Sequence, residues 1–186
     1  LPKPGAYVVR APHANHFSQG LVQHWLNSQE ETPFKSCLWL TASPKNEVRS
    51  FLEPYLLTRT GAPKGLDVVS VRNLWPKGHT KNGIRQLCRS LNTLCVLKPA
   101  LVIIDHAELW FNDNSEPVSR QNPLAQMRLL HQWAHHAQAH VVTTVQGDLP
   151  EWYTFADGLA DVSDHGEFEF SHGWPTQWGL PTHLWN

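Results

Sequence analysis

The sequence is poor in charge and has no long apolar run, and each shortage excludes a class of protein. Of its 186 residues, 17% are charged, with 15 Lys+Arg against 16 Asp+Glu. A near-neutral chain lacks the broad basic surface of a non-specific nucleic-acid binder. A membrane-spanning helix needs about 18 uncharged apolar residues, and the best candidate, 99–104, ends at Asp105. We therefore expect no nucleic-acid partner, and membrane contact only through another protein.

Cysteine is also scarce. Cys37, Cys88 and Cys95 form no CxxC pair and leave an odd count, which favours free thiols in a reducing compartment over a disulfide framework. The sequence opens on Leu1 without the charged and apolar regions of a signal peptide. We expect a cytoplasmic protein, seen here as a fragment without a signal peptide, and the low charge predicts a well-filled core.

Short apolar runs alternate with helical patterns up to about residue 145. Five runs are typical of buried strands, at 6–9, 37–40, 66–71, 101–104 and 141–145. Between them, apolar residues recur at helical spacing over 20–28, 47–57, 84–97 and 123–140. Continuously apolar strands need burial on both faces, and this alternation implies right-handed crossovers. The sequence therefore predicts an α/β fold, doubly wound around a mainly parallel sheet.

The pattern changes after Gly147. A short helix is predicted over 149–155 and a short strand over 158–162, and 167–171 alternates charged and aromatic residues as in an edge hairpin. The last segment, 173–186, holds two prolines and three tryptophans and has no clear periodicity. We predict one domain over 1–172 that ends in a C-terminal β-hairpin, followed by a Trp/Pro-rich tail.

The loops after the strands are the candidate ligand site, because ligands of open α/β sheets lie beyond the carboxyl ends of the strands. A phosphate-binding loop would need GxxxxGK[ST] after the first strand. The predicted loop, 11–18, has neither glycine nor lysine, and the first glycine after it is Gly20. His13 and His16 are the candidates for a phosphate contact. The polar residues that this vestigial loop retains are His13, Asn15, His16 and Ser18.

An aspartate directly follows the fourth predicted strand. Four apolar residues, 101–104, precede Asp105, which is the form of a Walker B strand with its carboxylate at the magnesium position. The alternative is structural, because Asp105 and His106 can form a satisfied polar pair at the rim of the sheet.

These features together resemble the RecA/KaiC-like ATPase core. The resemblance rests on the loop and helix after the first strand, the strand ending at Asp105, the fifth strand through Gln146, and the segment 155–162, and it spans most of 5–172. Such ATPases place a catalytic glutamate at the end of the second strand, where residues 41–43 hold no acid. The resemblance implies a RecA-like fold, and the two departures from it, the missing acid and the missing Walker A lysine, argue against hydrolysis of nucleotide.

A narrower resemblance is to the N-terminal domain of the bacterial cellulose-biosynthesis regulator family BcsE, which looks like a nucleotide hydrolase that has lost its active site. It rests on the strand 5–9, the strand ending at Asp105, the Trp-containing helix over 129–136 and the stretch 159–170. It implies a cytoplasmic regulatory subunit recruited to the inner-membrane cellulose synthase, with partners that include a small membrane protein of the BcsF type. That family binds cyclic-di-GMP through an RxGD motif in another domain. This sequence has no RxGD, so no direct site is expected.

Histidines suggest a metal site that the pattern does not complete. His131 and His135 lie one helical turn apart, as do His136 and His140. HExxH is absent and no third ligand is evident, and histidines are favoured near the C-terminus of a helix without any metal. We expect no metal and no cofactor. No GxSxG elbow or ordered triad points to a nucleophile either, so no catalytic residue is predicted.

Tryptophan is abundant, with 9 residues. Trp25, Trp39 and Trp133 fall in predicted core positions, whereas others lie in turns or in the tail, where they serve an interface or pack the edges of the sheet. The candidate interface residues are Trp110, Phe111, Trp152, Trp174 and Trp178. The preferred prediction is a non-catalytic protein-interaction and regulatory module that docks onto partner subunits and self-associates. The alternative is a nucleotide-binding ATPase or nucleotide sensor that uses Asp105 for magnesium and a non-standard phosphate loop.

Overall fold

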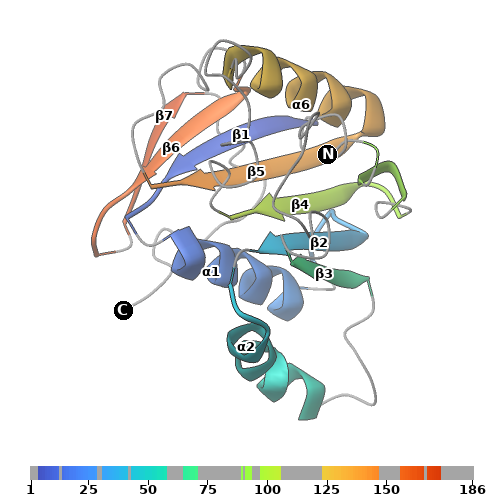
Figure 1. Ribbon diagram of the computed structural model, residues 1–186, viewed down its shortest axis with the longest axis vertical. Helices are drawn as coiled ribbons and strands as arrows, with labels where there is room; N and C mark the ends of the chain where they lie inside the picture. The colour runs from blue at the N-terminus through green and yellow to red at the C-terminus, as the bar shows by residue number, and fades with distance from the viewer. Residues whose placement is uncertain are drawn as a thin grey trace, which may run out of the picture.

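The computed structural model describes residues 4–12, 14–28, 31–41, 43–57, 65–70, 89, 91–93, 97–105, 123–146, 156–165 and 167–172. They form a seven-stranded sheet in the order β3-β2-β4-β5-β1-β6-β7, with helices on both faces (Figure 1). The strands are β1 (Gly5–Arg10), β2 (Ser36–Thr41), β3 (Leu66–Ser70), β4 (Ala100–Ile104), β5 (Ala139–Val145), β6 (Gly158–Val162) and β7 (Phe168–His172). The helices are α1 (Ala14–Asn27), α2 (Lys45–Leu57) and α6 (Pro123–Ala137).

The strand pairing confirms the predicted fold class. Every neighbouring pair from β3 to β6 is parallel, and only β6 and β7 run antiparallel. These two strands form the predicted C-terminal hairpin, with an irregularity between Leu159 and Ala160. Because the six parallel strands point the same way, their carboxyl ends share one edge of the sheet and their amino ends share the other.

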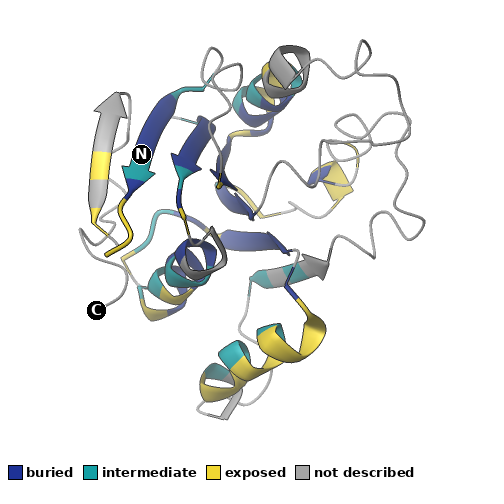
Figure 2. Cartoon of the chain, turned by 60° about the vertical axis from the view of Figure 1, so that its left-hand side comes forward, coloured by how far each residue is buried: buried dark blue, intermediate teal, exposed yellow. Residues whose placement is uncertain are grey.

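Two apolar layers fill the space between sheet and helices. β2, β4 and β5 are buried along their whole length, as their uninterrupted apolar runs require (Figure 2). Residues alternate across β1, so Ala6 and Val8 join the cluster under α6, whereas Tyr7 and Val9 join the cluster under α1. The sheet is therefore covered on both faces. A functional site can form at the edge where the parallel strands end or at the edge where they begin.

Helix α1 corrects the predicted loop over 11–18. The helix begins at Ala14, so only residues 11–13 separate it from β1. The helical spacing of apolar residues extends one turn further back than Leu21, to Phe17, and both side chains are buried. Because Phe17 anchors this first part of the helix against the sheet, the expected loop is largely helical.

Helix α6 is shorter than predicted. It ends at Ala137, Gln138 takes a left-handed conformation with φ of 55°, and His140 already belongs to β5. The left-handed residue ends the helix and turns the chain into the strand. The expected pair of His136 and His140 on one helical face was therefore wrong, whereas His131 and His135 remain one turn apart on α6.

Other predicted segments lie partly or wholly outside the described residues. Of the helix predicted over 84–97, residues 89, 91–93 and 97 are described; residues 89 and 91–93 are helical, whereas Leu97 lies in a bend. The helix predicted over 149–155 and the tail 173–186 fall outside the described residues. Among the residues that the structure describes, no helix has the length and apolar character needed to cross a membrane.

Candidate functional site

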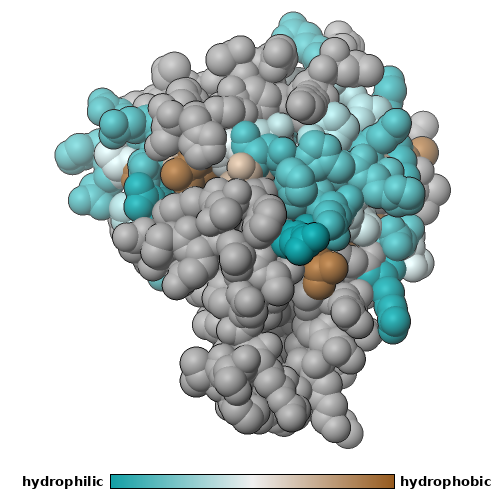
Figure 3. Space-filling model, turned by 90° about the horizontal axis from the view of Figure 1, so that it is seen from above, coloured by the Kyte–Doolittle hydropathy of each residue, from teal (hydrophilic) through white to brown (hydrophobic). Residues whose placement is uncertain are grey.

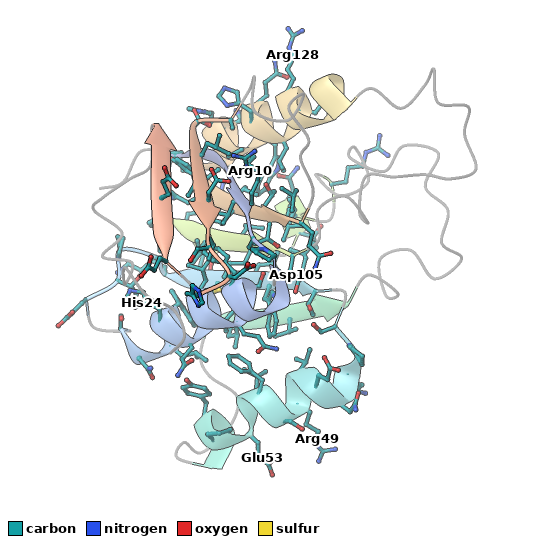
Figure 4. The ribbon with its side chains drawn as sticks, turned by 90° about the vertical axis from the view of Figure 1, so that its left-hand side faces the viewer. Arg10, His24, Arg49, Glu53, Asp105 and Arg128 are labelled. Atoms are coloured by element: carbon teal, nitrogen blue, oxygen red, sulfur yellow. The ribbon has the colours of Figure 1, made fainter. Side chains whose placement is uncertain are left out.

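The carboxyl edge of the sheet holds Asp105, the residue that directly follows β4. Its side chain is fully buried, and its Oδ2 accepts hydrogen bonds from Thr41 Oγ1 at 2.8 Å and from Trp39 Nε1 at 3.3 Å. Its backbone N–H also donates to Leu40 O at 3.1 Å. Asp105 lies inside the molecule in Figure 4, whereas the labelled Arg49 and Glu53 of α2 point away from the sheet. The carboxylate is thus tied to the end of β2.

Thr41 occupies the place where the RecA-like pattern would put a catalytic acid. Besides donating to Asp105, its Oγ1 accepts the backbone N–H of Ser43 at 3.0 Å. Ser43 is buried as well, and its Oγ has no hydrogen-bond partner among the described residues. The described end of β2 therefore carries hydroxyl groups and an indole around one buried carboxylate, with no second acid.

The connection from β1 to α1 is short and bonded to β5. The backbone N–H of Ala11 donates to Val145 O at 2.9 Å, and the side chain of Gln146 donates to Pro12 O at 3.1 Å. Proline has no backbone N–H to offer. This leaves little of the backbone of 11–12 for wrapping a phosphate group, which is bound through free amides.

The residues expected in the vestigial loop are placed differently by the structure. His13 falls outside the described residues, Asn15 and His16 belong to the first turn of α1, and their side chains are not among those described. Ser18 lies in the next turn, fully buried, and its Oγ has no hydrogen-bond partner among the described residues. Because Ser18 faces the core, it does not join Asp105 in one open site.

The carboxyl edge also holds a cationic side chain that the sequence patterns do not predict. Arg10, the last residue of β1, is paired in register with Asp161 of β6. Its Nη2 donates to Asp161 Oδ2 at 2.8 Å, and its Nε donates to the other carboxylate oxygen. No sequence motif announces this pair, because it depends on the register of two strands that are about 150 residues apart in the chain.

The predicted interface residues lie beyond the part of the chain that the structure describes. These are Trp110, Phe111, Trp152, Trp174 and Trp178. Trp25, Trp39 and Trp133, which were predicted to belong to the core, are buried.

The fold is RecA-like, as the solved structures that align with it indicate. No protein-family model matches the chain, and no curated protein matches its sequence. Among solved structures, the flagellar accessory protein FlaH from Methanocaldococcus jannaschii aligns with a TM-score of 0.59 at 13% identity over 89% of this chain and 76% of its own. The DNA-packaging ATPase B204 from Sulfolobus turreted icosahedral virus gives a TM-score of 0.57 at 15% identity over 87% of this chain and 77% of its own.

Proposed function

We propose that this chain is a non-catalytic RecA-like module that regulates other proteins by binding them. The observation that carries the proposal is the burial of the Asp105 carboxylate and its bonding to Thr41 and Trp39. Magnesium bound through Oδ2 would displace both bonds and leave the indole N–H of Trp39 unpaired in the core, and the full burial of the side chain closes the carboxylate to solvent. A buried polar group without a partner costs about 1–3 kcal/mol. This bonding favours a structural role for the aspartate.

The short connection after β1 supports the same proposal. A phosphate cradle needs backbone N–H groups that point at the ligand. Here the amide of Ala11 is bonded to Val145, and Pro12 has none. The described part of the connection, 11–12, thus offers no free amide. A RecA-like fold without a phosphate cradle would keep its helical layers and sheet edges, which are surfaces that partners can use.

Within this class, the resemblance to the BcsE family favours a role in bacterial cellulose secretion. The chain would act as a cytoplasmic regulatory subunit that self-associates and docks onto accessory subunits of the synthase. A small membrane protein of the BcsF type would recruit it to the inner membrane. Trp110, Phe111, Trp152, Trp174 and Trp178 are the residues assigned to these contacts.

Capture of the small membrane partner tests the binding role. The matched variant replaces the five aromatic residues with alanine. We expect capture to fall at least about tenfold while the melting temperature stays unchanged, because interface aromatics carry much of the binding energy. Equal capture by both chains would contradict the assignment of these residues, and no capture by the unaltered chain would contradict the partner.

A hydrolysis assay tests the absence of catalysis. Asp105→Asn keeps an acceptor oxygen for Thr41 but removes the charge that magnesium needs. We expect turnover of Mg-ATP and Mg-GTP to equal the buffer background in both proteins. Turnover by the unaltered chain that disappears in Asp105→Asn would show a working nucleotide site.

A further inference from the structure

Three potential metal ligands meet at the amino edge of the sheet, away from Asp105. His131 and His135 come from α6, and Asp157 directly precedes β6. His131 Nδ1 lies 2.8 Å from Asp157 Oδ2, and His135 Nε2 lies 3.0 Å from Asp157 Oδ1. All three donor atoms lie within 4.8 Å of one another. The structure thus supplies the third ligand that the helix alone does not provide.

The two histidines face the same point because of their helical spacing. Residues four apart lie on one face of a helix, and the His131 and His135 ring centroids are 4.4 Å apart. The intervening turn is anchored by Trp133 and Ala134, which are buried against the sheet. His136 lies outside this pair and is exposed.

Asp157 is held in place by the first strand and not only by the histidines. Its Oδ2 accepts the backbone N–H of Ala6 at 2.8 Å, and its own N–H donates to Ala6 O at 2.7 Å. Gly5 makes room for the carboxylate, because a Cβ at that position would lie 2.5 Å from Oδ2. Carboxylates that ligate metals are commonly oriented by hydrogen bonds of this kind.

We propose that His131, His135 and Asp157 bind a divalent transition-metal ion of the zinc class. Two imidazole nitrogens and one carboxylate oxygen are donors that such ions prefer, each at about 2.0–2.2 Å. Donors at these lengths around a tetrahedral ion lie about 3.3–3.6 Å apart. The two histidine–aspartate separations, 2.8 and 3.0 Å, run to different oxygens of Asp157 and are shorter than that range by about half an ångström. Side-chain rotations that widen these separations bring the two nitrogens and one carboxylate oxygen around a common ion.

The site is open enough for an ion to enter. The side chains of His131, His135 and Asp157 are 31%, 35% and 21% exposed. Hydrophilic residues dominate the described surface in the view from above, the side on which α6 lies (Figure 3). Three protein ligands leave at least one coordination position for water or for a fourth ligand. A bound ion would tie α6 to the edge formed by β1 and β6.

Titration of the metal-free chain with Zn²⁺ tests the proposal. Calorimetry in a non-coordinating buffer should show a site of one equivalent, and Co²⁺ should report its coordination by visible absorption. A hundredfold excess of free Zn²⁺ over the dissociation constant should raise the melting temperature by about 5–11 °C.

Four variants assign the ligands. Loss of a group that merely orients a ligand already weakens metal binding about 10–100-fold, so His131→Ala, His135→Ala and Asp157→Asn should each weaken the site at least about tenfold. His136→Ala is the matched control, because it removes a neighbouring exposed histidine and should leave the affinity unchanged. His131→Gln replaces His131→Ala if that variant does not fold.

Two results would overturn the proposal. One is the absence of a one-equivalent site in the unaltered chain, in which case the cluster is a hydrogen-bonded pair of imidazoles on one carboxylate. The other is a site that the variants at 131, 135 and 157 leave intact. In that case zinc binds elsewhere, among the remaining histidines of a chain that has 12 histidines in all.

Discussion

Thr41 donates a hydrogen bond of 2.8 Å to the buried carboxylate of Asp105, from the last residue of β2 to the residue that follows β4. β2 and β4 are neighbours in the sheet, so this bond joins two central strands at their carboxyl ends. An aspartate in this place would be strongly unfavourable to bury alone. The bonds from Thr41 and from the indole of Trp39 offset part of the cost of burying this carboxylate.

Thr41→Val should destabilise the fold by about 1–3 kcal/mol. Valine has nearly the same shape but no hydroxyl group, so it loses both the bond to the buried carboxylate and the bond accepted from the backbone N–H of Ser43. Thr41→Ser keeps the donor and loses one methyl group, which costs about 1 kcal/mol. Urea unfolding at pH 7 measures both changes. A valine variant as stable as the unaltered chain would show that the hydroxyl group of Thr41 contributes little.

Alkaline pH should destabilise the protein through Tyr7. Burial, and then the negative charge of Asp157, raise the pKa of Tyr7 from 10.0 to about 12. The unfolded chain therefore loses this proton near pH 10, while the folded chain keeps it. Stability that is fully present below pH 10 is lost as the pH rises toward 12, by up to about 3 kcal/mol.

The variant Tyr7→Phe isolates this effect. Phenylalanine carries no proton to lose, so its free energy of unfolding should fall less steeply between pH 9 and about 11.5 than that of the unaltered chain. Urea unfolding across this range gives both curves. Parallel curves would mean that Tyr7 ionises equally in the folded and unfolded states.

Gly5→Ala should disturb Asp157. The new methyl group would lie 2.5 Å from Oδ2 and 2.7 Å from Cγ of Asp157, so the carboxylate must move. Overpacking of this kind costs about 1–3 kcal/mol. In an Asp157→Ala background both atoms are gone and the same substitution should cost less, which a double-mutant cycle by urea unfolding measures. Equal costs in the two backgrounds would place the strain outside the carboxyl group, for example at Cβ of residue 157, which lies 2.9 Å from the new methyl group.

Asp161→Asn should matter little for stability. The Arg10 and Asp161 side chains are 34% and 32% exposed, and ion pairs of this kind contribute at most about 1 kcal/mol. Urea unfolding in low and high salt measures the loss, which should shrink as salt screens the pair. A loss well above about 1 kcal/mol that salt does not change would show that the pair behaves as a buried one.

The sheet could be predicted from the sequence because its strands are continuously apolar. β4 and β5 are buried on both faces, so their apolar runs are nearly uninterrupted. Such a run can be recognised as a strand without knowledge of the strands that lie beside it in the sheet. The first turn of α1 was missed, because its polar residues surround a single apolar anchor, Phe17. The end of α6 was placed too late, because His140 continues the helical pattern although it is a buried residue of β5.

The sites were harder to predict than the fold. The position of Asp105 follows from its strand, but its bond to Thr41 depends on the pairing of β2 with β4. Asp157 lies 26 residues after His131 and 22 after His135. The spacing of these three residues in the sequence does not predict that they lie together. Their proximity depends on the packing of α6 beside β1 and on the return of the chain along β6.

The melting temperature in millimolar Mg-ATP and Mg-GTP, compared with that in magnesium alone, shows directly whether the carboxyl edge of the sheet binds nucleotide. If Asp105 is a structural residue and the phosphate cradle is gone, neither nucleotide should change it. A ligand at a hundredfold excess over its dissociation constant would raise it by about 5–11 °C. A rise of that size, lost in Asp105→Asn, would contradict the account and establish a nucleotide site at the carboxyl edge of the sheet.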